Sequence, residues 1–567
     1  MIVLGVGRGH DSGVCLIENG KIRCVVEAER VFNIKHADGP GTIGECARVA
    51  FAETNIKPTD VQRVVVADTY RDNIEVMHPH IMTSTHEAAL LASFGSVGAY
   101  PHTRGGDLGI VGLRPDCPVF VVCHHVCHAA AGIYMSGFEQ SLVYVYDGYG
   151  ICCGTMGYQY KDNKLTRIES SKDRILIGWR YQLPGFFIRE INKETTKIYD
   201  FAGKLMGLSS YGSPDPLIVP ILENWLRGGF PDYERSWDAT TTPWFVSLAN
   251  PNGFTLNSAS VEQQDFRVLL SSIQEACNRV VSDEISALLE ETGDKNVILA
   301  GGCALNILTN DAVAKLPPVK ELFVPPNASD CGLAMGAAIV GAMTPETGLH
   351  FPDVSLADKR SPYKGPHLYN CETQPPVSAV DNLMALDEIV ERLSDGGIVG
   401  FVKGKMEIGP RALGHRSLLA DATRSDMREL LNVRIKKREW WRPFAPVARA
   451  VDAHEYFDLD YECPYMLRAA VVRPEWRDRL SPITHVDNTA RLQVLADEDV
   501  HPELWYILTE LKRRTGVGVC LNTSLNLGGN PIMNSMNEVH QFLNTTSVDF
   551  IYVNGLIHRK LNPPTKE

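Results

Sequence analysis

The sequence predicts an α/β protein of two domains, in which the first domain holds two copies of one strand pattern. A run of strand, polar turn, strand, hairpin and strand begins at residue 2. The same run returns after residue 140, and the chain changes character near residue 380, beyond a proline-rich stretch. A chain of 567 residues is long enough to bury a separate core in each of at least two domains.

The first copy of the pattern is defined by apolar runs and by the turn residues between them. Ile2 to Val6 is apolar, residues 7–11 form a polar turn, and residues 13–17 form the second strand. Asn19-Gly20 is a residue pair typical of a tight hairpin, so we expect residues 22–27 to form the third strand.

The second copy follows the same order. Leu142 to Tyr146 is a strand that ends in the turn 147–150, residues 153–160 form the next strand, and a hairpin at 162–164 leads into Leu165. Two copies of this pattern predict a duplicated α/β domain with a cleft between its halves. That is the plan of the actin, Hsp70 and sugar-kinase (ASKHA) superfold.

The domain boundary is placed where regular patterns stop. A long amphipathic helix is expected from Glu262 to Leu289, followed by a buried strand at 297–300. The chain between Pro345 and Pro376 is rich in proline and polar residues and has no clear periodicity. We therefore expect a first domain at 1–355, a linker at 356–380 and a second domain at 381–567.

Composition excludes some classes of function. Hydrophobic residues make up 44% and charged residues 22%, as in ordinary globular proteins, and the net charge of −13 argues against general nucleic-acid binding. No apolar run is long enough to span a bilayer. The 14 cysteines do not resemble a disulfide framework, which favours reduced thiols and a cytoplasmic location.

A candidate metal site centres on the segment Cys123 to His128. On a helix, His124 and His128 project from the same face, so one metal ion can reach both. Asp147 ends an apolar strand, and Asp330 lies in a turn before a helix, so either carboxylate is a candidate ligand. The alternatives are histidines that only satisfy local hydrogen bonds and an Asp330 that caps a helix.

Two glycine-rich turns and one histidine are further candidates. Residues 203–208 and 300–306 have glycines that let the backbone approach a phosphate or sugar, although a purely structural turn explains them as well. His10, beside Asp11, lies in the first strand turn and faces the expected cleft. Histidine is the natural general base near neutral pH, but a single His-Asp pair is weak support.

The second domain is notable for its cations. They are interleaved with Gly, Pro and apolar residues, which favours a concave anion site over a solvated face. Several Arg and Lys at one site suit phosphate, or a nucleotide together with a second phosphorylated compound. The cations include Lys403, Lys405, Arg411, Lys436, Arg438, Arg442 and Arg491, and polar side chains follow at Asn522 and Ser524.

Together these segments resemble the O-carbamoyltransferases of secondary metabolism, the family of the nodulation, cephem and nebramycin carbamoyltransferases. The resemblance covers nearly the whole chain. The segments that carry it are Gly9 to Ser12, His124 to His128, Asp147 to Gly150, Gly203 to Leu208, Gly301 to Asn306, Asp330 to Gly332, Glu407 to Ser417, Arg442 to Phe444, His485 to Gln493 and Asn522 to Ser524.

The resemblance implies a first domain similar to the universal tRNA threonylcarbamoyl transferase and a YrdC-like second domain. In this family, carbamoyl phosphate and ATP give carbamoyl-adenylate, and the carbamoyl group then passes to a hydroxyl of a small metabolite. A metal of the Fe(II) type is implied, Mg²⁺ is an option with ATP, and a homodimer is left open because dimerisation is not readable from the chain.

The resemblance also assigns roles to residues by their position. His10 corresponds to the residue beside the acceptor hydroxyl, and the metal ligands correspond to His124, His128, Asp147 and Asp330. Adenylate contacts in the first domain correspond to Lys204, Gly207, Gly301, Gly302 and Asn306. The sites for carbamoyl phosphate and ATP in the second domain correspond to Arg411, Lys436, Arg442, Arg491, Asn522 and Ser524.

Departures from the family leave some points open. The family commonly has a small residue where Cys127 and Cys303 stand, and Asp-Gly where Asp487-Asn488 stands. Thiols so close to the histidines allow zinc as the alternative metal. An ATP-dependent kinase or ATPase of the same fold, or a nucleotide-sensing regulator, is the alternative function. The acceptor is not identified, and its contacts are expected within 165–260 and near Glu27, Glu29 and Arg30.

Overall fold

The computed structural model describes residues 1–39, 41–68, 108–148, 154–171, 175–193, 197–228, 259–344, 348–349, 351–371 and 377–560. The turn residues Tyr149 and Gly150, the expected strand start at Cys153, and part of the stretch 165–260 lie outside these ranges.

The first sheet is built from the first strand pattern. Its strands are β1 (Ile2–Gly7), β2 (Gly13–Glu18), β3 (Lys21–Glu27), β4 (Arg63–Asp68) and β5 (Val119–Cys123), in the order β3-β2-β1-β4-β5. The first three strands are antiparallel neighbours, and β4 and β5 add in parallel. Asn19 and Gly20 have φ of 50° and 78°, the left-handed conformation that a tight hairpin requires. The expected hairpin is therefore confirmed.

The second sheet repeats this topology. Read from its edge, the order is β8-β7-β6-β9-β10, with β6, β7 and β8 antiparallel and β9 and β10 added in parallel. Both sheets thus have the strand order expected of a duplicated α/β domain. The strands are β6 (Ser141–Tyr146), β7 (Thr155–Lys161), β8 (Lys164–Arg167), β9 (Asn296–Ala300) and β10 (Glu321–Phe323).

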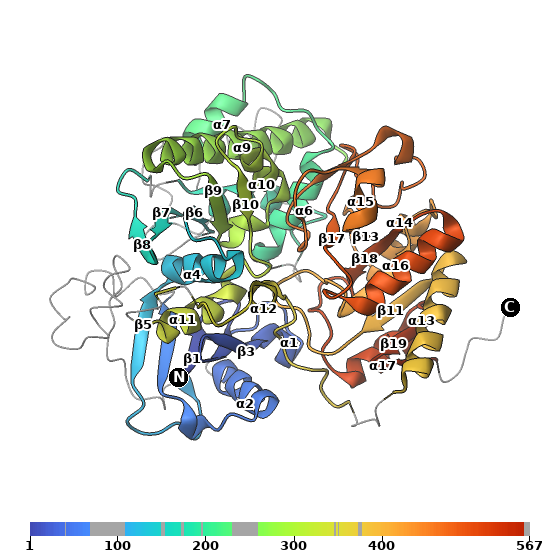
Figure 1. Cartoon of the computed structure of the whole chain (residues 1–567). Helices are drawn as coiled ribbons and strands as arrows, with labels where there is room; N and C mark the ends of the chain where they lie inside the picture. Colours follow the sequence, from blue (N-terminus) through green and yellow to red (C-terminus); the bar gives the residue numbers. More distant parts are fainter. Residues whose placement is uncertain are drawn as a thin grey trace.

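Two helices fill the space between these sheets (Figure 1). Helix α4 (His124–Ser136) packs on β6 and β9, α11 (Leu333–Ala342) packs on β1, β2 and β4, and the two helices pack on each other. Glycine permits the close approach: a Cβ at Gly336 would lie 1.9 Å from the carbonyl oxygen of Cys127. This close packing brings the start of α4 and the start of α11 together at one point.

Other helices cover the outer faces. Helix α9 (Gln264–Thr292) confirms the long amphipathic helix, and its buried side includes Phe266, Ile273 and Ile285. Gly293, at φ 71°, ends it. The remaining helices of this part are α1 (Ala28–Phe32), α2 (Thr42–Thr54), α5 (Ile177–Gln182), α6 (Phe201–Ser209), α7 (Val219–Leu226), α10 (Ile307–Ala314) and α12 (Leu356–Arg360).

The remainder of the chain contains a third sheet, which has seven strands. Its order is β17-β13-β18-β12-β11-β19-β20, with bounds β11 (Ile398–Val402), β12 (Arg416–Asp421), β13 (Ala445–Arg449), β17 (Gln493–Leu495), β18 (Val519–Ser524), β19 (Phe550–Val553) and β20 (Leu556–His558). A small sheet joins β14 (Phe457–Asp458), β15 (Ala470–Val472) and β16 (Thr489–Ala490).

Helices cover both faces of the seven-stranded sheet. One face packs on α13 (Ala379–Ser394) and α16 (Pro502–Thr515), and the other packs on α17 (Met536–Thr545). Shorter helices are α14 (Met427–Glu429) and α15 (Ala450–Tyr456). A π-helical turn, η12 (Leu430–Lys436), ends at Lys437, whose φ of 50° turns the chain sharply.

The two parts of the chain share a buried junction. Arg30 donates to the carbonyl oxygen of Gly409 at 2.8 Å, and the Gly409 amide donates to Glu27 at 2.7 Å. Asn310 donates to the carbonyl oxygen of Leu467 at 2.9 Å. Because Glu27 and Arg30 are buried in this junction, an acceptor cannot reach their side chains unless the junction opens. The expectation that acceptor contacts lie near these residues stays a prediction.

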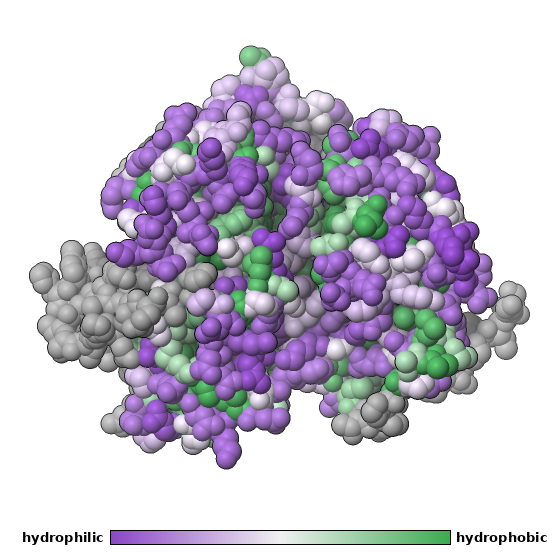
Figure 2. Space-filling view, in the orientation of Figure 1, coloured by the Kyte–Doolittle hydropathy of each residue, from purple (hydrophilic) through white to green (hydrophobic). Residues whose placement is uncertain are grey.

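One face of the molecule is largely polar. Hydrophilic residues dominate the face of the molecule shown in Figure 2. In the described part of the chain, no helix combines the length and the apolar character needed to cross a membrane.

Candidate metal centre and anion site

Helix α4 begins at the last residue of β5, which fixes the first candidate ligands. Cys123 is the extended residue before the helix, and His124 is its first residue. His128 follows one turn later on the same face. Both imidazoles are buried, with 3% and 1% of the side chain exposed, so the helix presents them to the interior.

Two carboxylates meet these imidazoles. Asp147 directly follows β6, and Asp330 opens the short turn η11 (Asp330–Gly332) that leads into α11. The Nε2 atoms of His124 and His128 are 3.1 Å apart. Each lies 3.4 Å from Oδ1 of Asp330, and they lie 2.8 and 3.6 Å from Oδ2 of Asp147. The structure therefore brings all four expected ligands together.

This donor set fits a metal ion. The four ligand atoms lie within 4.8 Å of one another. Tetrahedral coordination with bonds of roughly 2.0–2.2 Å places ligand atoms about 3.3–3.6 Å apart, close to the separations here. Two imidazoles and two carboxylates suit a divalent transition metal.

The charges of the cluster also favour a cation. Burial opposes ionisation of Asp147, but its hydrogen bonds to His124 and His128 hold the pKa of this carboxyl well below its usual value. Burial alone would lower the pKa of His128, but Asp147 and Asp330 raise it to about 9. A bound metal ion would supply the positive charge that protons supply otherwise.

The glycine-rich turn after β9 supports Asp147. The Gly302 amide donates to Oδ1 of Asp147 at 2.8 Å, which leaves Oδ2 free to face the imidazoles. Gly301 has φ of 91°, and a Cβ there would lie 2.2 Å from the carbonyl oxygen of Tyr146. Asn306 caps α10, accepting from the amides of Leu308 and Thr309. The adenylate contacts expected of these residues stay predictions.

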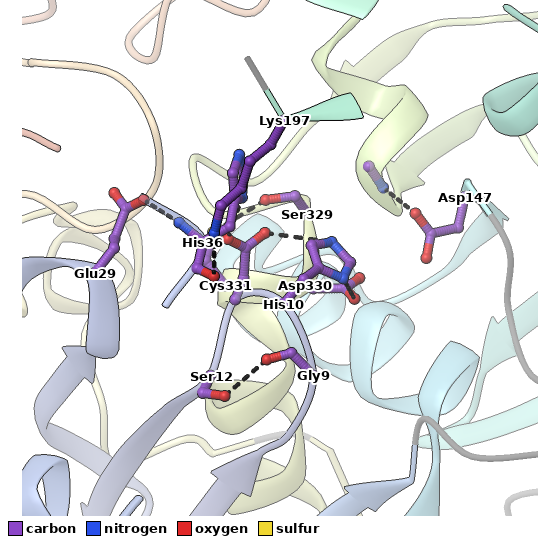
Figure 3. A network of polar contacts seen from close by, with 12 residues as sticks. Gly9, His10, Ser12, Glu29, His36, Asp147, Lys197, Ser329, Asp330 and Cys331 are labelled. Carbon is purple, nitrogen blue, oxygen red and sulfur yellow. Dashed lines mark hydrogen bonds and ion pairs between the residues drawn. The ribbon is translucent and has the colours of Figure 1, made fainter. Parts of the chain in front are cut away.

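His10 lies at the open side of the candidate metal centre (Figure 3). Its Nδ1 is 3.6 Å from Oδ2 of Asp330, and a third of its side chain is exposed. The ring stacks on Tyr199 with centroids 4.0 Å apart. A group that approaches the four-ligand cluster from this side would meet His10.

A second histidine lies beside His10. His36 hydrogen bonds through Nδ1 to Asp11 at 2.7 Å, and its Nε2 is 3.7 Å from Asp200. Burial alone would lower the pKa of His36, but these two carboxylates raise it to about 9. Lys35 also pairs with Asp200. Sequence analysis missed His36 because it lies alone in a short segment with no recognisable spacing to another ligand.

Helix α6 carries Lys204 and Gly207 to the junction with the second part of the chain. Lys204 pairs with Glu439 at 2.8 Å, and its carbonyl oxygen accepts from the indole of Trp441 at 3.2 Å. The carbonyl oxygen of Gly207 lies 2.9 Å from Nε2 of His485. The structure therefore places these two expected adenylate contacts beside the cations of the second part.

Five cations of the second part of the chain lie close to one another and form a cluster. Burial lowers the pKa values of four of them, and the neighbouring cation Arg442 adds to the shift in each case; the four are Arg411, Lys436, Arg438 and Arg491. Burial and Arg442 lower the pKa of Arg411 to about 10. Among the described residues, the Nε atoms of Arg411 and Arg491 are buried without a hydrogen-bond partner. The cation cluster consists of Arg411, Lys436, Arg438, Arg442 and Arg491.

Polar residues support the cation cluster. Lys436 donates to the backbone and hydroxyl of Ser524 and to Asn526 at 2.7 Å. Asn522 is fully buried and donates to Gln493 at 2.8 Å and to the carbonyl oxygen of Ala412, the residue after Arg411, at 3.3 Å. Five cations gathered in this way are suited to a polyanion. Arg438 also belongs to the cluster; the sequence placed it among the cations of the expected anion site, although the family resemblance gave it no role.

In the described residues, a duplicated α/β domain holds a candidate metal site of four buried ligands. It is joined to a part of the chain that holds a candidate anion site, the cation cluster. The family described as "Carbamoyltransferase N-terminus" matches residues 2–339, and "Carbamoyltransferase C-terminus" matches residues 390–560. The chain therefore belongs to the carbamoyltransferase family, and it is an enzyme of the carbamoyltransferase type. Membership does not favour the kinase and regulator alternatives.

Two relatives with similar sequences match this chain over most of its length. Nodulation protein NolNO of Sinorhizobium fredii is 29% identical over 97% of this chain and 79% of its own length. Nodulation protein NolO of Bradyrhizobium diazoefficiens is 32% identical over 77% of this chain and 78% of its own. Among solved structures, the activator of the 2-hydroxyisocaproyl-CoA dehydratase from Clostridium difficile is 15% identical, covering 60% of this chain and 94% of its own, with a TM-score of 0.33. A likeness that weak carries no argument.

Proposed function

We propose that this enzyme is an ATP-dependent O-carbamoyltransferase that forms carbamoyl-adenylate at the cation cluster and transfers the carbamoyl group to a hydroxyl beside the four-ligand cluster. The observation that carries the proposal is the pairing of two different sites, one cationic and one with metal-ligand geometry, in a member of the carbamoyltransferase family. Tyr199 and Asp200, just before helix α6, contact His10 and His36, and Lys204 within the helix pairs with Glu439 beside the cation cluster.

The domain assignment is part of the proposal. Residues 1–355 form an ASKHA-type domain, which the repeated sheet topology supports. Residues 381–567 form the YrdC-like domain with the cation cluster. The segment 356–380 connects them and contains α12.

The first half-reaction takes place at the cation cluster. Carbamoyl phosphate, ATP and water give carbamoyl-adenylate, pyrophosphate and phosphate. Both substrates and both released products are anions, so Arg411, Arg442 and Arg491 hold phosphate oxygens and offset the charge that builds on the leaving pyrophosphate. Lys436 is held in place by Ser524 and Asn526, and Asn522 and Ser524 provide polar contacts to carbamoyl phosphate and ATP.

The second half-reaction takes place beside the four-ligand cluster. His124, His128, Asp147 and Asp330 hold a divalent ion, for which we propose Fe(II), while Mg²⁺ accompanies ATP. When bound, such an ion supplies Lewis-acid polarisation of an oxygen. The acceptor oxygen bonds to the carbamoyl carbon as AMP leaves, and His10 accepts the hydroxyl proton, because it lies exposed at the same edge as Asp330. Gly302 orients Asp147 through its amide.

The acceptor is proposed to be a small hydroxylated metabolite that enters on the side of His10 and Tyr199. We place the reaction in the cytoplasm. The cysteines in the described part of the chain are all free thiols, which supports a reducing compartment.

The decisive test measures pyrophosphate released from ATP, with and without carbamoyl phosphate. We expect release only when both are present. Arg442→Ala should lower the rate by about 10-fold or more, because it removes a charge-assisted contact to phosphate. The matched control is Arg514→Ala, which changes an exposed arginine of α16. Release without carbamoyl phosphate, or an Arg442→Ala rate equal to the control, would contradict the proposal.

A further inference from the structure

Glu439 stands out among the groups around the cation cluster. It is the one described carboxylate that forms an ion pair there, with Arg442 at 3.6 Å. It also binds Lys204 of α6 at 2.8 Å, across the junction between the two parts of the chain. The side chains of Glu439 and Lys204 are only 10% and 12% exposed. A single carboxylate is thus buried between cations from two domains.

The position of Glu439 is fixed by its neighbours. Trp441 donates its indole N–H to the carbonyl oxygen of Lys204, so α6 is docked on the loop that carries Glu439. His485, through Gly207, and Asp487, through Ser210 at 2.8 Å, hold the far end of α6. Because the loop and the helix are held independently of the Lys204–Glu439 pair, the carboxylate can exchange partners without undocking α6.

Glu439 is ionised in this setting. Burial would raise its pKa, but Arg442 and Lys204 hold the pKa below its usual value. The carboxylate therefore cancels part of the positive charge that a phosphate would otherwise meet. A substrate phosphate that pairs with Arg442 has to compete with it, and so does a product phosphate that remains bound.

We propose that Glu439 is an internal counter-ion that pairs with Arg442 and Lys204 while the anion site is empty and gives up Arg442 to substrate phosphate. The inference rests on the proposed function, because it requires that the cation cluster binds polyphosphate. When pyrophosphate leaves, Glu439 pairs with Arg442 again. Glu439 is thus a positioning residue that weakens product binding and favours release from a site with five cations.

The test measures the affinity of inorganic pyrophosphate for the full-length protein by calorimetry. Glu439→Gln keeps the shape of the side chain and removes its charge, so we expect pyrophosphate to bind about tenfold more tightly than to wild type. Glu439→Ala should also bind more tightly. The matched control is Glu429→Gln, an exposed glutamate close in sequence, which should match wild type. Thermal unfolding of each variant verifies that it is folded.

The outcomes separate this inference from the proposed function. Tighter binding by both Glu439 variants supports the counter-ion role, because a purely structural residue would leave affinity unchanged or weaken it. Binding by the variants that is equal to or weaker than wild type overturns it, while the anion site stands. If neither wild type nor the Glu439 variants bind pyrophosphate, the anion site of the proposed function fails and the counter-ion role fails with it.

Discussion

His128 is the residue on which the candidate metal centre depends most. Its imidazole is almost fully buried and lies within 3.6 Å of three other ligand atoms. It does not touch the cation cluster in the second part of the chain. Loss of this side chain should therefore affect one half-reaction and leave the other.

We expect His128→Ala to lose bound metal and to lower carbamoyl transfer by about 100-fold or more, while carbamoyl-phosphate-dependent pyrophosphate release stays within about twofold of wild type. Metal content by elemental analysis and the two rates provide the measurement. The control is His454→Ala, an exposed histidine of α15. Equal loss of both half-reactions would contradict the two-site arrangement.

Local sequence patterns predicted most of the individual residues of the candidate metal centre. His124 and His128 were visible from their spacing, and Asp147 from its strand end, because those signals are local. The bond from the Gly302 amide to Asp147 joins residues 155 positions apart, and no local pattern carries such a contact. His36 was missed for the same reason: its partners Asp11 and Asp200 come from separate segments.

At the scale of elements, the packing of α4 on α11 sets the distance between the two duplicated sheets. Gly336 is the point of closest approach, because its missing Cβ makes room for the carbonyl oxygen of Cys127. That carbonyl belongs to the residue beside His128. The same contact therefore supports both the fold and the metal ligands.

Gly336→Ala should destabilise the protein by about 3 kcal/mol, because the added methyl group meets a backbone atom that cannot swing away. The measurement is the free energy of unfolding from denaturant titration. Gly203→Ala is the comparison: a Cβ at Gly203 meets nothing within 4 Å, so its stability should stay close to wild type or rise. Equal stability of the two variants would show that α4 and α11 do not pack this closely.

The elements themselves were predictable to different degrees. The two hairpins could be predicted from Asn19-Gly20 and from the residues around Asn163. Such residues tolerate the positive φ that a tight turn needs, and this preference is a local property of the sequence. The order of the seven-stranded sheet was not, because β11 pairs with β19 about 150 residues later and neighbouring strands such as β13 and β17 are set by tertiary packing.

At the scale of the whole molecule, the junction between the two parts contains an unusual acid. Glu27 is buried and accepts from the Gly409 amide at 2.7 Å. Burial raises its pKa to about 7, although Arg30 opposes the shift. The folded protein thus binds a proton on Glu27 more tightly than the unfolded chain does.

Stability should consequently fall as pH rises from about 4.5 to 7, the interval between the unfolded and folded pKa values of Glu27. Glu27→Gln removes the titrating group, so the decline in melting temperature between pH 5 and pH 8 should be shallower than in wild type. Glu290→Gln, at an exposed position of α9, should keep the wild-type slope. If the melting temperature of Glu27→Gln falls with pH as steeply as that of wild type, Glu27 is not protonated in the folded state.

Helix α6 and the two residues before it have a further consequence for carbamoyl-adenylate, the proposed intermediate. Tyr199 and Asp200, just before it, contact His10 and His36, and Lys204 and Gly207 within it contact the loops beside the cation cluster. Its nine residues span only about 13 Å. In the proposed two-site reaction, the carbamoyl donor thus has a short path from the site where it forms to the site where it is used, which limits its exposure to water.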